Sequence, residues 1–335
     1  MLRTAHYPAR YCVRLMALVW VVLSLLALFP FLAGAQPARR LYRIGTVNEA
    51  WAANHPTVEG LKAGLKERGL EEGRHVTFDI RYTRGNPQAI PVAVTALLKA
   101  GVDLLFTSHE AATQAARAAT DRIPIVFTLV GDPVAAGIVS ELTHPGGNLT
   151  GVSSLTTQLV PKRLEMLKAL VPTLRRVWAL YYTEDPSSLA AVRKAQEAAP
   201  LLKLELVAQP VRTSQELATV FQALRPGDGL LPPDIVTLDI PAHILEASLA
   251  ERVPAVFSTA LWVTYGGLVS YGSDYYAVGF QAARLVAKIL QGARPQDLPV
   301  EGADQIGLAV NLKTAERLGL TVPYKVLLRA DKTLR

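Results

Sequence analysis

The alternation of short apolar runs with longer helical segments is the feature that most constrains the fold of this chain. The run at 41–47 is followed by a segment in which Val58, Leu61 and Leu65 share one helical face. The alternation continues, and the run at 123–130 is almost wholly apolar, which is typical of a strand buried on both faces of a parallel sheet. We therefore expect an α/β fold whose helices cover both faces of a parallel sheet.

A second series of strand and helix patterns begins after Asn148-Leu149-Thr150-Gly151. About ten strand–helix units are too many for one sheet of ordinary size. We therefore predict two Rossmann-like lobes, each with a parallel sheet, joined by a hinge near residues 145–153. Asn148, Thr150 and Gly151 are the candidate hinge residues.

The first 35 residues have the composition of a secretory signal. They combine three arginines, an apolar stretch from Leu15 to Leu32, and the small residues Ala33-Gly34-Ala35. We predict a signal peptide over residues 1–35, cleaved after Ala35, and a periplasmic or otherwise extracytoplasmic protein. The alternative is an uncleaved signal that anchors the chain, because about 18 apolar residues are just long enough to span a bilayer.

Charge and cysteine content exclude several classes of function for the remaining chain. The whole sequence carries 35 basic and 28 acidic side chains, and three of the basic ones lie in the predicted signal. A surplus this small, without a long basic run, does not indicate nucleic-acid binding. The single cysteine, Cys12, also lies in the signal, so disulfides, thiol nucleophiles and cysteine metal sites are excluded from the mature protein.

The histidines do not suggest a metal site. His55, His109 and His144 show no metal-ligand spacing, and we expect them to be solvated or to cap helices. We predict neither a metal nor a cofactor.

Polar and aromatic residues follow the predicted strands, where open parallel sheets bind their ligands. Hydroxyls, carboxylates and aromatic rings predominate, a set that suits a small zwitterion or a polar ring. The candidate ligand-binding residues are Thr46, Trp51, Ser108, Thr128, Asp132, Tyr182, Asp234, Ser258, Trp262, Tyr271 and Asp274.

Several of these candidates have an alternative structural role. Asp132 and Asp274 also fit the N-cap position of a helix. Trp51 and Trp262 also fit packing against loops. The sequence contains no dinucleotide-binding, P-loop, hydrolase-elbow or zinc-protease motif, and the adjacent Ser108-His109 pair has a geometry that seldom activates a nucleophile. These observations favour a binding protein over an enzyme.

Several motifs resemble one known family. They include Val130-Gly131-Asp132-Pro133-Val134, the Pro-Gly-Gly-Asn-Leu-Thr-Gly-Val-Ser segment at 145–153, Lys162-Arg163-Leu164-Glu165, and the segment 266–272. From about residue 41 to the C-terminus, the chain closely resembles the ABC transporter substrate-binding proteins, a family that includes tryptophan-binding TrpX-like proteins. The resemblance is weakest at 181–185 and 231–234, where the chain departs from the usual family pattern.

The resemblance implies a type I periplasmic binding protein, with a ligand held between two lobes. On this basis we assign residues 36–152 plus 273–299 to the first lobe. Residues 153–272 plus 300–335 are assigned to the second.

The expected function is that of a monomeric extracytoplasmic receptor. It would capture a small solute, an amino acid and in particular an aromatic one, and deliver it to an ABC permease and its ATPase in the cytoplasmic membrane. Asp132 or Asp274 would pair with the α-ammonium of the ligand. The alternatives are a ligand-sensing receptor for a membrane signalling partner, or an exported enzyme on the same scaffold.

Overall fold

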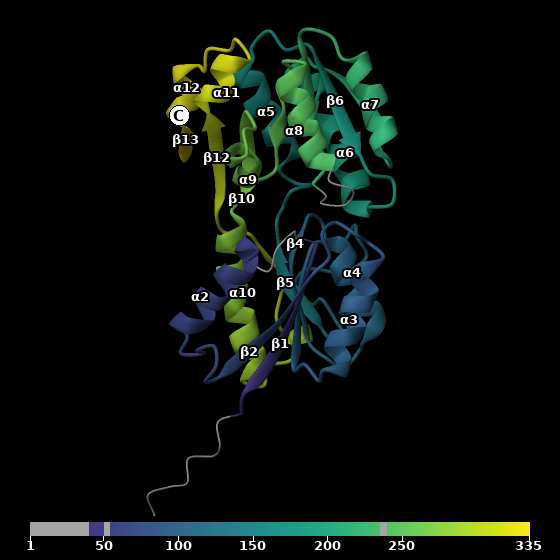
Figure 1. Cartoon of the computed structure of the whole chain (residues 1–335), viewed down its shortest axis with the longest axis vertical. Coiled ribbons are helices and arrows are strands. Elements are labelled where there is room, and N and C mark those ends of the chain that lie inside the picture. Colours follow the sequence, from purple (N-terminus) through teal and green to yellow (C-terminus); the bar gives the residue numbers. More distant parts are fainter. Residues whose placement is uncertain (1–39, 50–53, 235–239) are drawn as a thin grey trace, which may run out of the picture. The chain divides into compact units, whose positions relative to one another are not determined.

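The strands of the computed structural model form three hydrogen-bonded sheets (Figure 1). The structure describes residues 40–49, 54–234 and 240–335. The predicted signal at 1–35 therefore lies outside the described residues. No helix within the described ranges is both long and apolar enough to cross a membrane.

The first lobe contains a six-stranded sheet in the order β11-β5-β4-β3-β1-β2, in which every neighbouring pair is parallel. β3 and β4 are buried at every position because helices cover both of their faces. The strands are β1 (Tyr42–Asn48), β2 (Val76–Tyr82), β3 (Leu104–Ser108), β4 (Ile125–Val130), β5 (Leu149–Ser153) and β11 (Glu301–Gly302).

Two pairs of helices enclose this sheet. Helices α2 (Pro56–Glu67) and α10 (Tyr275–Leu290) cover one face, and α3 (Ala89–Lys99) and α4 (Glu110–Ala119) cover the other (Figure 1). Each face has its own apolar core, so the predicted helix–sheet–helix layering of the first lobe is confirmed.

Helices α2 and α10 pack with their backbones in contact, although more than 200 residues separate them in the sequence. A Cβ atom at Gly279 would lie 1.9 Å from the carbonyl oxygen of Thr57, and one at Gly60 would lie 2.0 Å from that of Tyr276. Only glycine permits such an approach. The contact returns the chain to the first lobe after it has built the second.

The second lobe has two sheets. The strand order is β7-β6-β8 in one and β13-β12-β10-β9 in the other, and a bridge between Leu230 and Ala255 connects them. β10 and β12 are antiparallel, which departs from the predicted parallel sheet, whereas the other pairs are parallel. The strands are β6 (Arg176–Tyr181), β7 (Glu205–Pro210), β8 (Asp228–Leu231), β9 (Val256–Phe257), β10 (Val269–Ser273), β12 (Ile306–Asn311) and β13 (Lys332–Leu334).

Helices pack around these two sheets and complete the α/β fold of the second lobe. Its apolar cores involve side chains from α5, α6, α7 and α8. The helices are α5 (Val160–Leu170), α6 (Pro186–Ala198), α7 (Ser214–Ala223), α8 (Ile240–Ala250), α9 (Ala260–Thr264), α11 (Leu312–Arg317) and α12 (Tyr324–Leu327).

The chain passes between the lobes three times: between β5 and α5, between β10 and α10, and between β11 and β12. The predicted hinge residues Asn148, Thr150 and Gly151 lie at the start of β5 and within it, just before the first of these crossings. β11 belongs to the range assigned by prediction to the second lobe, yet it pairs with β5 in the first. The remaining lobe boundaries stay a prediction.

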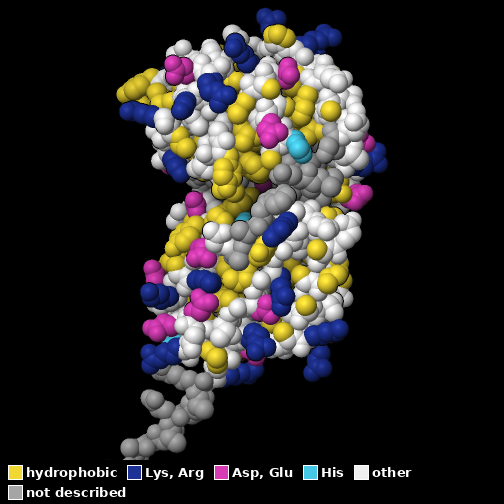
Figure 2. Space-filling model, viewed as in Figure 1, with side chains coloured by type: hydrophobic (Ala, Val, Ile, Leu, Met, Phe, Trp, Pro, Cys, Tyr) yellow, Lys and Arg dark blue, Asp and Glu magenta, His cyan; other side chains and the backbone are white. Residues whose placement is uncertain are grey.

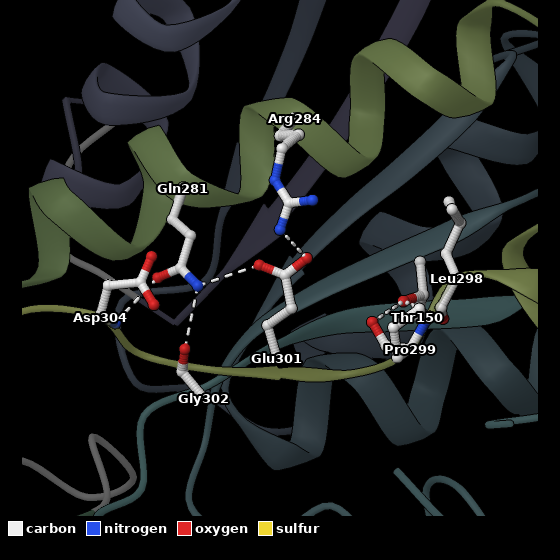
Figure 3. Close-up of polar contacts among 8 residues, drawn as sticks. All are labelled: Thr150, Gln281, Arg284, Leu298, Pro299, Glu301, Gly302 and Asp304. Atoms are coloured by element: carbon white, nitrogen blue, oxygen red, sulfur yellow. Dashed lines mark hydrogen bonds and ion pairs between the residues drawn. The ribbon is translucent and has the colours of Figure 1, made fainter. Parts of the chain in front are cut away.

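Side chains of α10 hold the third crossing (Figure 3). The Gln281 amide donates to the Glu301 carboxylate at 3.0 Å and to the Gly302 carbonyl at 2.9 Å, and its oxygen accepts from the Asp304 amide. Arg284 pairs with the same Glu301 carboxylate. The Thr150 hydroxyl donates to the Leu298 carbonyl at 2.9 Å. The third crossing is thus anchored to the first lobe on its N-terminal side.

The contact between α2 and α10 predicts a steric cost at Gly279. In Gly279→Ala the new methyl group would meet the Thr57 carbonyl, so the helices must separate. We expect a loss of about 1–3 kcal/mol in the free energy of unfolding, measured by urea denaturation, despite the better helix propensity of alanine.

The matched control is Gly307→Ala in β12, where the nearest atom would lie 3.4 Å from the new methyl group. This variant should stay within about 0.5 kcal/mol of the parent. Equal stability of the two variants would contradict the assigned contact.

Candidate ligand-binding site

The strand order of the first lobe places a topological switch point between β1 and β3. The chain connects β1 to β2 on one side, and β3 and β4 follow on the other. Ligands of open α/β sheets bind beyond the carboxyl ends of the strands at such a point. The carboxyl ends of β1, β3 and β4 therefore locate the candidate site.

Three predicted residues meet at this edge as a group of buried hydroxyls. The Ser108 hydroxyl lies 3.1 Å from that of Thr128 and 3.3 Å from that of Thr57, a residue that the sequence analysis did not select. Thr46, on the adjacent strand β1, is fully buried, and its hydroxyl has no hydrogen-bond partner among the described residues. The prediction that strand ends gather hydroxyls is correct for these positions.

Three aromatic rings pack next to these hydroxyls. The ring centroids of His55 and Tyr275 lie 5.7 Å apart, and those of His109 and Tyr275 lie 6.1 Å apart. Burial, together with the neighbouring His109, lowers the pKa of His55 to about 3, and burial also lowers the pKa of His109. Both imidazoles are neutral at pH 7. His55 and His109 occupy the N-cap positions of α2 and α4, as expected, but both are buried and neither side chain forms a cap hydrogen bond.

His109 has a strained backbone and an unsatisfied side chain. Its φ of 69° and ψ of 168° belong to a region that glycine favours. Neither ring nitrogen has a hydrogen-bond partner within the described parts of the chain, although the residue is buried. Groups held in this way cluster at functional sites, where the surrounding structure maintains the strain.

Three carboxyl groups approach this region from both lobes. Glu110, the first residue of α4, accepts a hydrogen bond from the Gly131 amide at 2.7 Å. Asp185 accepts from the Ser187 and Ser188 amides, each at 3.0 Å, and so caps α6. Asp234 follows β8 and accepts from the Ser258 hydroxyl.

Burial and mutual repulsion govern the charge of these groups. Burial, followed by the charge of Asp185, raises the pKa of Glu110 well above its usual range. Burial raises the pKa of Asp185 to about 6, although the amides that it caps favour its ionised form. Glu110 therefore keeps its proton to higher pH than an exposed glutamic acid does, while Asp185 is largely ionised at neutral pH.

Two adjoining cavities, each of about 430 Å³, share Glu110, Asp185 and Asp234 in their walls. One, which we call the Tyr182 cavity, is also lined by His109 and Tyr182. The other, the Arg163 cavity, extends to Arg163 on α5. Both lobes contribute to each cavity.

Of the ten described candidates, only Tyr182 and Asp234 line either cavity. The carboxylate of Asp274 caps α10 through the Ala277 amide, as the alternative interpretation proposed, whereas that of Asp132 accepts from the Ala135 amide within a turn. Trp262 stacks on Phe257 with ring centroids 6.1 Å apart, and Tyr271 packs against the core of the second lobe. Trp51 lies outside the described residues.

Sequence reasoning did not select three charged residues that line the cavities, namely Glu110, Asp185 and Arg163. Glu110 and Asp185 lie at helix starts, where acidic residues are common for reasons unrelated to ligands. Arg163 lies within one of the motifs that resemble the family, which was the available signal. Nothing in the sequence pattern indicates that its side chain is buried. No group of acidic residues and histidines that could hold a metal exists among the described residues.

Two α/β lobes that jointly line a cavity are the architecture of the type I periplasmic binding proteins. The more particular assignment comes from comparison of the sequence. A model of the ABC transporter substrate-binding proteins matches residues 51–334, and the chain belongs to this family.

Individual relatives agree with this assignment. A tyrosine-binding protein from Clostridioides difficile (strain R20291) is 27% identical over 272 residues, which cover 79% of this chain and 78% of that protein. A conserved domain protein from Vibrio cholerae is 29% identical, with a TM-score of 0.79. An ABC domain in complex with L-Trp from Streptococcus pneumonia is 26% identical, with a TM-score of 0.78. Each of these two solved structures matches 88% of this chain and is covered over its whole length.

The protonated state of Glu110 predicts a pH-dependent effect of its replacement. In the unfolded chain Glu110 ionises near pH 4.5, whereas the folded protein keeps its proton to higher pH. Its contribution to stability is therefore lost as the pH rises above 4.5 towards the folded pKa. Glu110→Gln cannot ionise, so its melting temperature relative to the ligand-free parent should rise between pH 5 and pH 8.

Comparison of variant with parent at each pH cancels the opposing contributions of His55 and His109. Glu67→Gln, at an exposed position on α2, is the control and should change the melting temperature little at either pH. A shift for Glu110→Gln that is the same at pH 5 and pH 8 would show that this carboxyl group is not held protonated.

Proposed function

We propose that this protein is the extracytoplasmic binding component of an ABC importer that captures an aromatic amino acid. It is exported by the signal at residues 1–35, which is cleaved after Ala35. As a monomer, it delivers its ligand to the membrane permease, whose ATPase drives transport.

The observation that carries the proposal is the pair of cavities lined from both lobes. His109 and Glu110 of the first lobe face the same space as Tyr182, Asp185 and Asp234 of the second. A ligand that contacts both walls stabilises the arrangement in which the walls are close, because opening the lobes removes one set of contacts. Permeases could then distinguish the loaded protein from the empty one.

The chemistry of the walls supports an amino acid. Asp234 and the ionised Asp185 suit an ammonium group, and Tyr182 and His109 offer ring surfaces. Among the relatives described above, those whose names give a ligand are described with tyrosine and tryptophan. On the described walls the rings come from Tyr182, which the sequence analysis selected, and from His109, which it did not select.

The charge on the face shown in Figure 2 is mixed. On the face shown in Figure 2, Lys and Arg side chains are scattered among acidic ones instead of forming one basic patch. This distribution agrees with the small positive surplus in the sequence.

Direct binding tests the proposal. Native mass spectrometry of the freshly purified protein should reveal a trapped aromatic amino acid. Calorimetric titration with L-tryptophan, L-tyrosine and L-phenylalanine should show binding, whereas D-glucose should show none. Retention of a sugar or a peptide, together with no heat from the three amino acids, would overturn the proposal.

A pair of matched variants locates the ammonium group. Asp234→Asn removes a charge that both cavities share, and should weaken binding of the best amino acid by roughly 100-fold or more, as expected when a buried charge loses its partner. Asp132→Asn alters a side chain that caps a turn and does not line either cavity, and should change the affinity less than about threefold. The opposite ranking would place the ammonium at Asp132.

A further inference from the structure

Arg163 is a buried cation that forms no ion pair with the part of the chain that the structure describes. It lies in the first turn of α5, directly after the first crossing between the lobes, and its side chain is 2% exposed. One guanidinium nitrogen, Nη2, donates to the Thr156 carbonyl. The Nε atom is buried with no hydrogen-bond partner, and no carboxylate in the described ranges forms an ion pair with Arg163.

The position of this cation is costly unless something binds to it. Burial lowers the pKa of Arg163 to about 10, so the guanidinium stays charged at neutral pH. A buried charge that lacks both an ion-pair partner and a full set of hydrogen bonds destabilises a protein. Natural proteins keep such groups mainly where function requires them.

Arg163 lies in the wall of the Arg163 cavity together with Asp234 and Asp185. Asp234 is near enough for its charge to favour the charged form of Arg163, yet the two do not form an ion pair. The cavity therefore presents a cation and carboxylates as separate groups. This is the arrangement expected for a dipolar ligand that places one end on each.

We propose that Arg163 binds the carboxylate of the ligand, so that the site selects free α-amino acids over amides and amines of the same side chain. This inference rests on the proposed function and specifies it. The planar fork of a guanidinium matches both oxygens of a carboxylate, which an ammonium cannot do. The ligand's own ammonium then faces Asp234 and Asp185, which fixes its orientation.

A purely structural role is the competing explanation, because Arg163 also ties the Thr156 carbonyl of the first crossing to α5. The two roles differ in which ligands a substitution affects. Loss of a structural tie weakens every ligand of the site to a similar extent. Loss of a carboxylate partner weakens only ligands that carry a carboxylate.

The experiment is a calorimetric comparison of four ligands on four proteins. The ligands are L-tryptophan, L-tryptophanamide, tryptamine and 3-indolepropionate. All four contain the same indole ring, and they differ in whether they carry the ammonium group and the carboxylate. The proteins are the parent, Arg163→Met, Arg163→Lys and the control Lys162→Met. Lys162 is the preceding residue, is partly exposed and pairs with Glu165, so its loss should leave all affinities unchanged.

We expect the parent to bind L-tryptophan roughly 100-fold more tightly than L-tryptophanamide, as for a charged hydrogen-bonded pair. Arg163→Met should abolish this preference by weakening L-tryptophan about 100-fold and the amide less than threefold. Arg163→Lys, which keeps the charge without the fork, should lie between them. Thermal unfolding of each variant verifies that it is folded.

Equal weakening of L-tryptophan and its amide in the Arg163 variants would overturn the assignment, as would equal binding of the two by the parent. Binding of 3-indolepropionate that depends on Arg163, without binding of L-tryptophan, would overturn the amino-acid proposal and leave the Arg163 assignment intact. Binding of tryptamine alone would overturn both, as would failure to bind every ligand of the panel together with L-tyrosine and L-phenylalanine.

Discussion

The backbone contact between α2 and α10 is the constraint on which the rest of the structure depends. Gly60 and Gly279 let two helices from opposite ends of the chain touch. This contact closes one face of the first sheet with a helix that follows the second lobe. It also places Tyr275, the first residue of α10, beside His55 at the start of α2. The same packing contact therefore closes the first lobe and positions the rings of His55 and Tyr275 beside the candidate site.

The site itself concentrates features that a protein selected only for stability would avoid. Neutral buried histidines, a protonated glutamic acid and an unpaired guanidinium lie where the two lobes meet. His109 adds a backbone conformation that glycine favours. Each of these costs free energy in the absence of ligand, and together they leave the ligand to supply the missing partners. Unpartnered buried polar groups and a strained backbone thus occur together where binding is expected.

Sequence reasoning predicts features that depend on short stretches of chain. The apolar run of β4 shows its double-sided burial directly, and the rule that ligands bind at strand ends brings Ser108 and Thr128 together correctly. The rule does not separate Asp132 and Asp274 from ligand contacts, because the cap of a turn or a helix and a ligand contact need the same side chain at the same place. The position of Arg163 and Asp185 in the cavity walls depends on how segments far apart in the sequence meet, which no local pattern records. The antiparallel pairing of β12 is non-local for the same reason.

The late return of α10 and β11 has a consequence for how the chain folds. The first lobe begins at residue 41, but its core lacks one covering helix and its sheet lacks one edge strand until residue 302 is available. The second lobe is in effect an insertion, and most of it can fold while the first is still incomplete. Contacts of such long range slow folding. An emerging chain would therefore hold its N-terminal strands without their final helix cover for most of its synthesis, a state open to chaperones and to export machinery alike.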